Sequence, residues 1–163
     1  MNSLIGLVLG FLLVMPLAVL LHELGHVTPQ LIAGHSAEIR LGSGKNPKEF
    51  RLGKLKLLVA PFSMNVGFAS IKRDVSKNLQ ILSLLMGPVV SLTLCACLYV
   101  ISRHELPYLV QYLVSFGMYF SLIQFLFTFI PIYYPSYFCA YEGTPSDGRQ
   151  VLELLGLMKG QGA

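Results

Sequence analysis

The chain has 163 residues, of which 54% are hydrophobic and 12% are charged, with a formal net charge of +4 at pH 7. Soluble globular domains carry about 25% charged residues, so this composition and a mean hydropathy of +0.64 argue against a water-soluble protein. Several apolar runs approach the roughly 20 residues that cross a bilayer, which predicts one multi-pass α-helical membrane domain over residues 1–163. The basic residues do not form an aromatic-rich soluble face, so we expect no nucleic-acid partner.

The first predicted element is a long helix over residues 3–33, because helix formers fill it and residues 4–21 form an apolar run. At about 1.5 Å per residue it reaches about 46 Å, which exceeds the hydrocarbon thickness of about 30 Å. We therefore expect it to tilt, kink or protrude, with Pro16 as the natural kink site and Gly34 as its end. No positive region precedes the run and no cleavage site follows it, so we expect a retained anchor.

This helix continues into a His-Glu-Leu-Gly-His motif at residues 22–26. Residues four apart on a helix share a face, so His22 and His26 can both reach one tetrahedral zinc ion, and Glu23 can reach water at the metal. Ionisable groups in an apolar helix mark function, because a charged one at mid-bilayer costs roughly 2.5 to 3.5 kcal/mol. The alternatives are a buried cluster satisfied by neighbouring helices and a chance match.

Residues 36–77 form a predicted β-rich loop of turn signals and short, mixed segments. Polar and apolar residues alternate in 49–52 and in 54–57, as in strands with one buried face, and Gly53 between them predicts a bulge or bend. The chain is then wholly apolar through Phe62, a run too short for another span. We predict a small membrane-associated β element, whose backbone groups must pair within the sheet or line a cavity.

Two further transmembrane spans and a short C-terminal helix follow. Residues 79–101 form the second predicted span, in which we assign Gly87-Pro88 and the nearby hydroxyl residues a structural role in helix packing. Residues 108–134 form the third, with Gln124 and Thr128 as its polar members. A loop then leads to an amphipathic helix over 147–158.

The distribution of basic residues predicts the orientation of the chain. The turn between the second and third spans holds one of the 12 lysines and arginines, and the C-terminal tail holds two. The other nine lie between the first two spans: Arg40, Lys45, Lys48, Arg51, Lys54, Lys56, Lys72, Arg73 and Lys77. The positive-inside rule places this basic loop and the C-terminus in the cytoplasm and the N-terminus outside, so the ends of the first and third spans can meet.

A catalytic zinc ion usually has three protein ligands and one open position, so a third ligand is needed beside the two histidines. Asp147 is the best candidate, because the turn after the third span can aim its carboxylate back into the bundle. Its alternative role is to cap the short helix that follows. Glu142, His35 and Cys139 are the rival ligands.

These motifs together resemble the site-2 protease family of intramembrane zinc metalloproteases. The shared features are the 22–26 motif at the end of a first span, a basic β-rich loop, Met-Gly-Pro-Val-Val-Ser at 86–91, and Pro-Ser-Asp-Gly at 145–148 after a span ending Phe-Ile-Pro. The resemblance implies His22, His26 and Asp147 as zinc ligands and Glu23 as the catalytic base. It also implies that the substrates are transmembrane segments, cut within or near the membrane.

The chain departs from the family pattern at two places. Thr128 stands where family members commonly have an asparagine thought to assist at the active site, and its hydroxyl can still donate a hydrogen bond. The loop over 131–147 is longer than the family's usual short turn.

The chemistry expected is zinc-dependent hydrolysis of peptide bonds, with Glu23 as general base on the zinc-bound water. Because a helical substrate must unwind first, we hypothesise that an edge strand within 54–60, at Leu57 and Leu58, pairs with it. The expected partners are a transmembrane protein or peptide substrate, the lipid bilayer and a regulatory membrane protein. The rival functions are a non-catalytic membrane adaptor or metal-binding protein, a prenyl-protein peptidase and a metal transporter.

Overall fold

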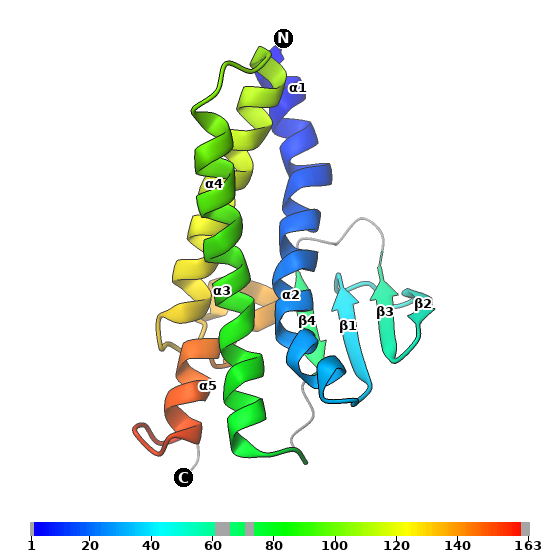
Figure 1. The fold of residues 1–163 in the computed structure, drawn as a ribbon, viewed down its shortest axis with the longest axis vertical. Helices are drawn as coiled ribbons and strands as arrows, with labels where there is room; N and C mark the ends of the chain where they lie inside the picture. Colours follow the sequence, from blue (N-terminus) through cyan, green and yellow to red (C-terminus); the bar gives the residue numbers. More distant parts are fainter. Residues whose placement is uncertain (1, 61–65, 71–73, 161–163) are drawn as a thin grey trace.

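The computed structural model describes residues 2–60, 66–70 and 74–160, so residues 61–62 of the predicted apolar run and the basic pair 72–73 lie outside the described residues. Long helices stand side by side, a four-stranded sheet lies against the first, and a short helix follows the last (Figure 1). As predicted, three helical stretches of the described chain are long and apolar enough to cross a membrane: Ser3–Ile32, Lys77–Ser102 and Tyr108–Phe129.

The first helical run comprises α1 (Asn2–Leu9), η1 (Gly10–Val14) and α2 (Met15–Ile32). The middle piece is a π-helical turn, in which the Met15 N–H donates to the Gly10 carbonyl oxygen. It ends just before Pro16, which has no N–H for the ordinary helical ladder, so the preceding turn absorbs the irregularity expected at this proline. Gly34 follows the end of the run, as predicted, at φ +85°, with its N–H donating to the Leu31 carbonyl oxygen.

The sheet has four strands: β1 (Ala37–Leu41), β2 (Lys48–Leu52), β3 (Leu55–Val59) and β4 (Gly67–Ser70). Their order is β2-β3-β1-β4, with β1 and β3 parallel and the other neighbours antiparallel. β2 and β3 fall on the two alternating segments of the sequence, and Gly53, at φ +60°, lies between them.

The hypothesis of an edge strand at Leu57 and Leu58 is wrong. Both residues lie on β3, which pairs with β2 on one side and with β1 on the other. Parallel pairing with β1 is a contact between distant segments that the alternation of residues does not reveal. Among the described residues, the outer strands of the sheet are β2 and β4.

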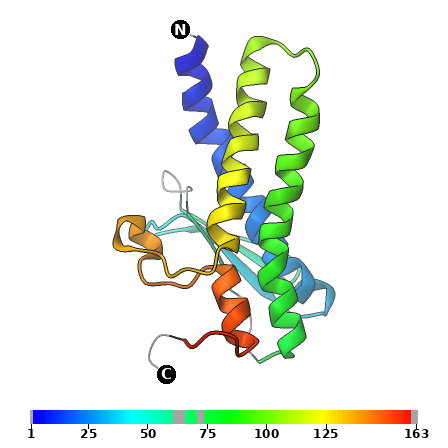
Figure 2. The same cartoon turned by 90° about the vertical axis from the view of Figure 1, so that its left-hand side faces the viewer.

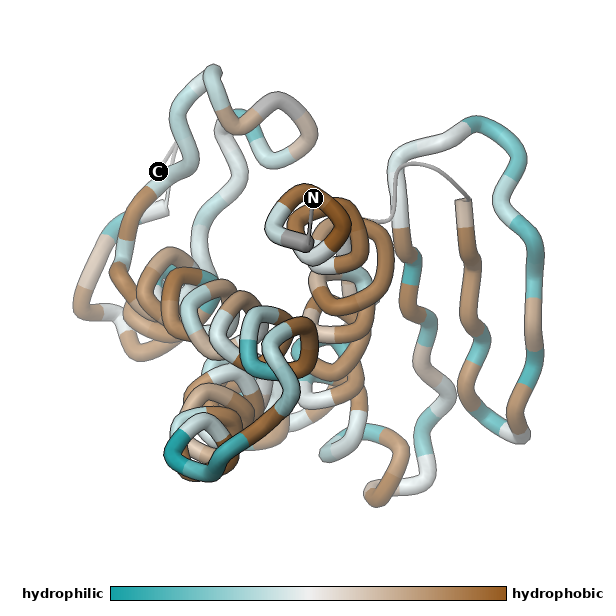
Figure 3. The backbone as a smooth tube through the Cα atoms, turned by 90° about the horizontal axis from the view of Figure 1, so that it is seen from above, coloured by the Kyte–Doolittle hydropathy of each residue, from teal (hydrophilic) through white to brown (hydrophobic). Residues whose placement is uncertain are grey.

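Strand β1 fixes the sheet to α2 through its alternating buried side chains. Ala37, Ile39 and Leu41 form one buried cluster with Val19 and Val27 of α2. Burying one such aliphatic side chain stabilises the fold by roughly 1.5–3 kcal/mol. Seen from above, polar positions gather along the strand and loop farthest from the helices (Figure 3).

Helix α3 (Lys77–Ser102) contacts both α2 and α4 (Tyr108–Phe129) and contains the predicted second span. Ser76 caps it, with its side-chain oxygen accepting from the Leu79 N–H at 3.4 Å. A Cβ atom on Gly25 of α2 would lie 2.6 Å from the Met86 carbonyl oxygen. The backbones of α2 and α3 therefore approach as closely as a glycine allows.

Two predicted boundaries are wrong because both helices are shorter than expected. α4 ends at Phe129 rather than at 134, since Ile130 is extended ahead of Pro131. The last helix, α5 (Asp147–Leu154), stops before 158, and Gly156 follows it at φ +76°. Between them lies the 3-10 helix η2 (Ser136–Tyr141), which projects sideways from the helices (Figure 2).

Candidate metal centre

His22 and His26 lie one turn apart on α2 and are buried, with 3% and 4% of their surface exposed. Their Nε2 atoms lie 3.0 Å apart. The predicted i, i+4 arrangement therefore brings two ligand atoms to one point on the buried face of the helix.

Asp147 completes the group from the first turn of α5. Its Oδ2 atom lies 3.3 Å from His26 Nε2 and 3.6 Å from His22 Nε2. Donors about 2.0–2.1 Å from a tetrahedral zinc ion are about 3.3 Å from one another. The separations among these three atoms are close to that value, and the group can hold a metal ion.

The capping role considered for Asp147 belongs to its neighbour. Ser146 Oγ accepts a hydrogen bond from the Arg149 N–H at 3.2 Å and donates one to the Ile130 carbonyl oxygen at 2.7 Å. Ser146 is the N-cap of α5 and is 1% exposed. The Asp147 carboxylate is therefore directed to the histidines, while the cap is supplied by the preceding residue.

Helix α3 orients both imidazoles through their other nitrogen. His26 Nδ1 lies 2.8 Å from the Ser83 carbonyl oxygen, which can only accept, so Nδ1 carries a hydrogen and Nε2 is the atom that faces Asp147 and His22. His22 Nδ1 lies 2.8 Å from Ser91 Oγ. Both rings are thus held through Nδ1 while their Nε2 atoms face one place, which is how ligating histidines are oriented in metal sites.

Gly87 makes room for this arrangement. A Cβ atom on Gly87 would collide with the His26 ring at Nε2. Ser83, Gly87 and Ser91 are spaced four apart, are all buried, and form a stripe of small residues on α3 that faces the two histidines. The structural role in helix packing that we predict for this region thus includes room for the histidines, and the spacing of small and polar residues in an apolar span is the sequence signal for it.

The charge state of Asp147 suits a metal ligand. Burial alone would raise the pKa of its carboxyl, but the adjacent His26 and His22 outweigh it and lower the pKa to about 2. The group is therefore a carboxylate at neutral pH.

Glu23 is 6% exposed and lies between α2 and β4. The Ala69 backbone N–H donates to its carboxylate. A Cβ atom on Gly67 would lie 2.6 Å from Glu23 Oε1, so a glycine at this position lets the strand pass the carboxylate. The sheet thus positions the acid of the motif as well as covering α2.

A cavity of about 1010 Å³ opens beside these groups. Glu23 and the three candidate ligands line it, together with β4 and the chain that follows α4. Thr128 also lines it, and its hydroxyl donates to the Gln124 and Phe125 carbonyl oxygens of its own helix at 2.9 and 3.3 Å. Leu57 and Leu58, on β3, are not among its lining residues in the described chain.

The rival ligands lie elsewhere. Glu142 is exposed on the loop before α5, and His35 lies beyond the end of α2. Neither belongs to the group of ligand atoms in the described residues. Cys139 lies on η2, and its side chain is outside the described ones.

No protein-family model matches the chain, and a search of curated proteins finds no match. The function is therefore inferred from the chemistry of this site and from the motifs of the sequence.

Proposed function

We propose that the chain is a membrane-embedded zinc endopeptidase that hydrolyses peptide bonds in or near transmembrane segments of other proteins. The observation that carries the proposal is the convergence of ligand atoms from His22, His26 and Asp147, which all lie within 4.8 Å of one another, beside the buried Glu23. The resemblance of the motifs to site-2 proteases supports the same class of reaction.

Insertion into a membrane is supported by the apolar surface of the helices. Leu4, Leu12 and Leu13 are 67%, 61% and 61% exposed on the first helical run, and Val100 and Tyr119 are 59% and 60% exposed on α3 and α4. Such surface is unfavourable in water and favourable in lipid. By the positive-inside rule, we place the N-terminus outside and both the basic loop and the C-terminus in the cytoplasm.

Zinc fits the donor set, because two imidazole nitrogens and one carboxylate oxygen leave a fourth position open, as in catalytic zinc sites. When bound, zinc polarises a carbonyl group and lowers the pKa of water to about 7. Other divalent metals use the same donor types, so metal content is part of the test.

Glu23 is the proposed general base, which takes a proton from water and returns it to the leaving amine. The Ala69 N–H holds its carboxylate at the wall of the cavity. The cavity, at about 1010 Å³, has room for water and for a stretch of unwound peptide. A helical substrate must unwind to enter, because its carbonyl groups are otherwise held in its own hydrogen bonds.

The decisive experiment compares purified wild type with Glu23→Gln and His26→Ala. We expect wild type to contain one zinc ion and to cleave a synthetic transmembrane peptide, Glu23→Gln to keep the metal without cleaving, and His26→Ala to lose both. Cleavage that survives Glu23→Gln would refute the role of this residue. Wild type that holds zinc and cleaves no transmembrane peptide would instead be a metal-binding scaffold, which is the alternative function.

A further inference from the structure

The outer strand β4 carries an unusual contact at its first residue. The Gly67 N–H donates to the Tyr141 hydroxyl oxygen at 2.9 Å, and the same hydroxyl donates to the Gly67 carbonyl oxygen at 3.0 Å. Burial raises the pKa of the Tyr141 phenol, so the group keeps its proton. One side chain therefore gives this residue both of the hydrogen bonds that a neighbouring strand would give it.

These contacts lie on the side of β4 that pairs with no strand among the described residues. Gly67 is paired in register with Leu41 of β1, and its N–H and carbonyl groups are bonded to Tyr141. Two residues on, the Ala69 N–H donates to Glu23. Alternate residues of a strand direct their backbone groups to the same side, so Tyr141 and Glu23 share one edge of β4.

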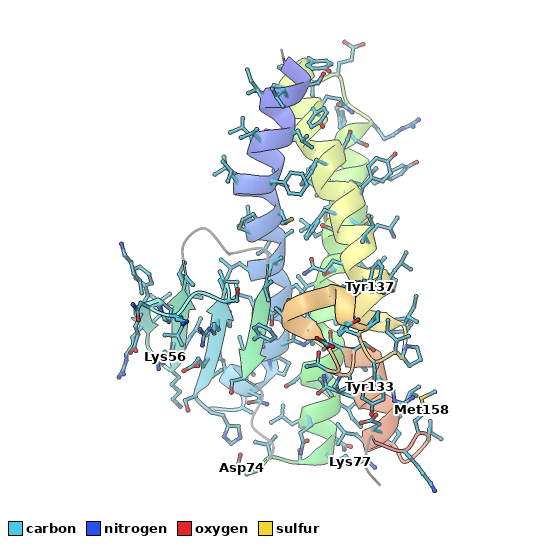
Figure 4. All side chains as sticks on the ribbon, turned by 180° about the vertical axis from the view of Figure 1, so that it is seen from behind. Lys56, Asp74, Lys77, Tyr133, Tyr137 and Met158 are labelled. Carbon is cyan, nitrogen blue, oxygen red and sulfur yellow. The ribbon has the colours of Figure 1, made fainter. Side chains whose placement is uncertain are left out.

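Tyr141 belongs to residues 131–146, which we name the strap. Two backbone hydrogen bonds join its ends. The Ser146 N–H donates to the Ile132 carbonyl oxygen at 2.9 Å, and the Tyr134 N–H donates to the Thr144 carbonyl oxygen at 3.0 Å. The strap reaches from α4 to the side of β4 (Figure 4) and lines the same cavity as Glu23. Phe138 and Tyr141 of its η2 helix are among the residues that line this cavity beside the candidate metal centre.

Tyr141 is the residue of the strap whose contacts with β4 are described. Beyond the two hydrogen bonds of Tyr141, its ring packs on Phe68, with ring centroids 5.0 Å apart. Both hydrogen bonds are neutral, and a peptide backbone can replace them one for one.

We propose that the strap is a gate, in which Tyr141 is a latch on Gly67 that an extended peptide must displace before it can lie along β4. The proposal rests on the proposed function only for the identity of that peptide. The apparent affinity for a peptide equals the intrinsic affinity multiplied by the fraction of molecules in which the latch is open, so releasing the latch tightens binding.

The test removes one hydroxyl in Tyr141→Phe, with Tyr119→Phe as the matched control, since Tyr119 is 60% exposed on α4. Hydrogen–deuterium exchange measures directly whether the Gly67 amide is protected by its hydrogen bond to Tyr141. We expect faster exchange in Tyr141→Phe at the Gly67 amide and at the strap amides of Tyr134 and Gly143, and no change in Tyr119→Phe. Unchanged exchange in Tyr141→Phe would overturn the latch.

A second measurement tests whether the strap limits peptide binding. The probe is a synthetic fluorescent apolar peptide with a central Gly-Pro, and binding is measured in a Glu23→Gln background so that nothing is cleaved. We expect the Kd to fall about tenfold in Tyr141→Phe and to stay the same in Tyr119→Phe. Equal or weaker binding by Tyr141→Phe overturns the gate, even where exchange is faster. Both readouts are independent of turnover, so a failure of the peptidase proposal is seen separately, as absent cleavage by zinc-loaded wild type.

Discussion

Gly87 lies against the imidazole of His26 so closely that a Cβ atom on it would collide with the ring. Gly87→Ala must therefore displace the ring, the helix or both. We expect this variant to fold and to bind zinc roughly 10- to 100-fold more weakly, which is the usual effect of disturbing groups that orient a metal ligand. Metal content after dialysis against a zinc buffer series measures it.

Gly117→Ala on α4 is the matched control. A Cβ atom there would meet methyl groups of Leu98 and Val14 at 3.0 Å, away from the candidate centre. We expect its zinc affinity to equal that of wild type. Equal loss of zinc in both variants would mean that the effect of Gly87→Ala is general misfolding.

The histidine pair and the helices could be predicted from local pattern. The positions of His22 and His26 follow from their spacing on a helix, and the apolar runs predict the three long helices. The ends of the helices are harder to predict from the sequence. α4 ends where the backbone becomes extended at Ile130, although the sequence remains apolar beyond that point.

The remaining parts of the site depend on contacts between distant segments. Whether Asp147 caps a helix or faces the histidines depends on Ser146, which takes the cap. Both residues are good caps, so their local sequence leaves the question open. Likewise nothing near Tyr141 in the sequence indicates its contact with Gly67, because β4 is brought to it by pairing with β1.

Substitutions at Asp147 and at Ser146 should distinguish metal binding from helix capping. We expect Asp147→Asn to lose zinc and also to lower the melting temperature of the metal-free protein at neutral pH, because folding lowers the pKa of the Asp147 carboxyl and its carboxylate therefore stabilises the fold. Ser146→Ala should lower the stability of the metal-free protein by about 1 kcal/mol, because it removes the cap of α5. Thermal unfolding and zinc content of the two variants measure these effects. Full zinc binding by Asp147→Asn would place the third ligand elsewhere.

The contact of α5 with Tyr133 should weaken at acidic pH, because Glu153 of α5 becomes protonated. Its pKa is lowered, first by the hydrogen bond from the Tyr133 hydroxyl at 2.6 Å and then by that from Arg149 Nε at 2.8 Å. A carboxyl group whose pKa is lowered by folding stabilises the fold above its unfolded pKa of about 4.3, and this contribution is lost as the pH falls through the folded value.

Below about pH 4, the melting temperature of wild type should therefore fall more steeply than that of Glu153→Gln, which has no titratable group at this position. Melting curves of the two proteins between pH 7 and pH 3, recorded without metal, provide the comparison. Parallel curves would show that the Glu153 contacts add nothing to stability.

Zinc should stabilise the fold because its proposed ligands join α2 to α5. A ligand that binds only the folded state adds about 2.7 kcal/mol at 100 times its Kd. We expect a chelator to lower the melting temperature of wild type and of Glu23→Gln by the same amount, since Glu23 is the base and not a ligand. The melting temperature of Asp147→Asn should be the same with and without chelator. A chelator effect that disappears in Glu23→Gln would make Glu23 a ligand and would contradict its assignment as the base.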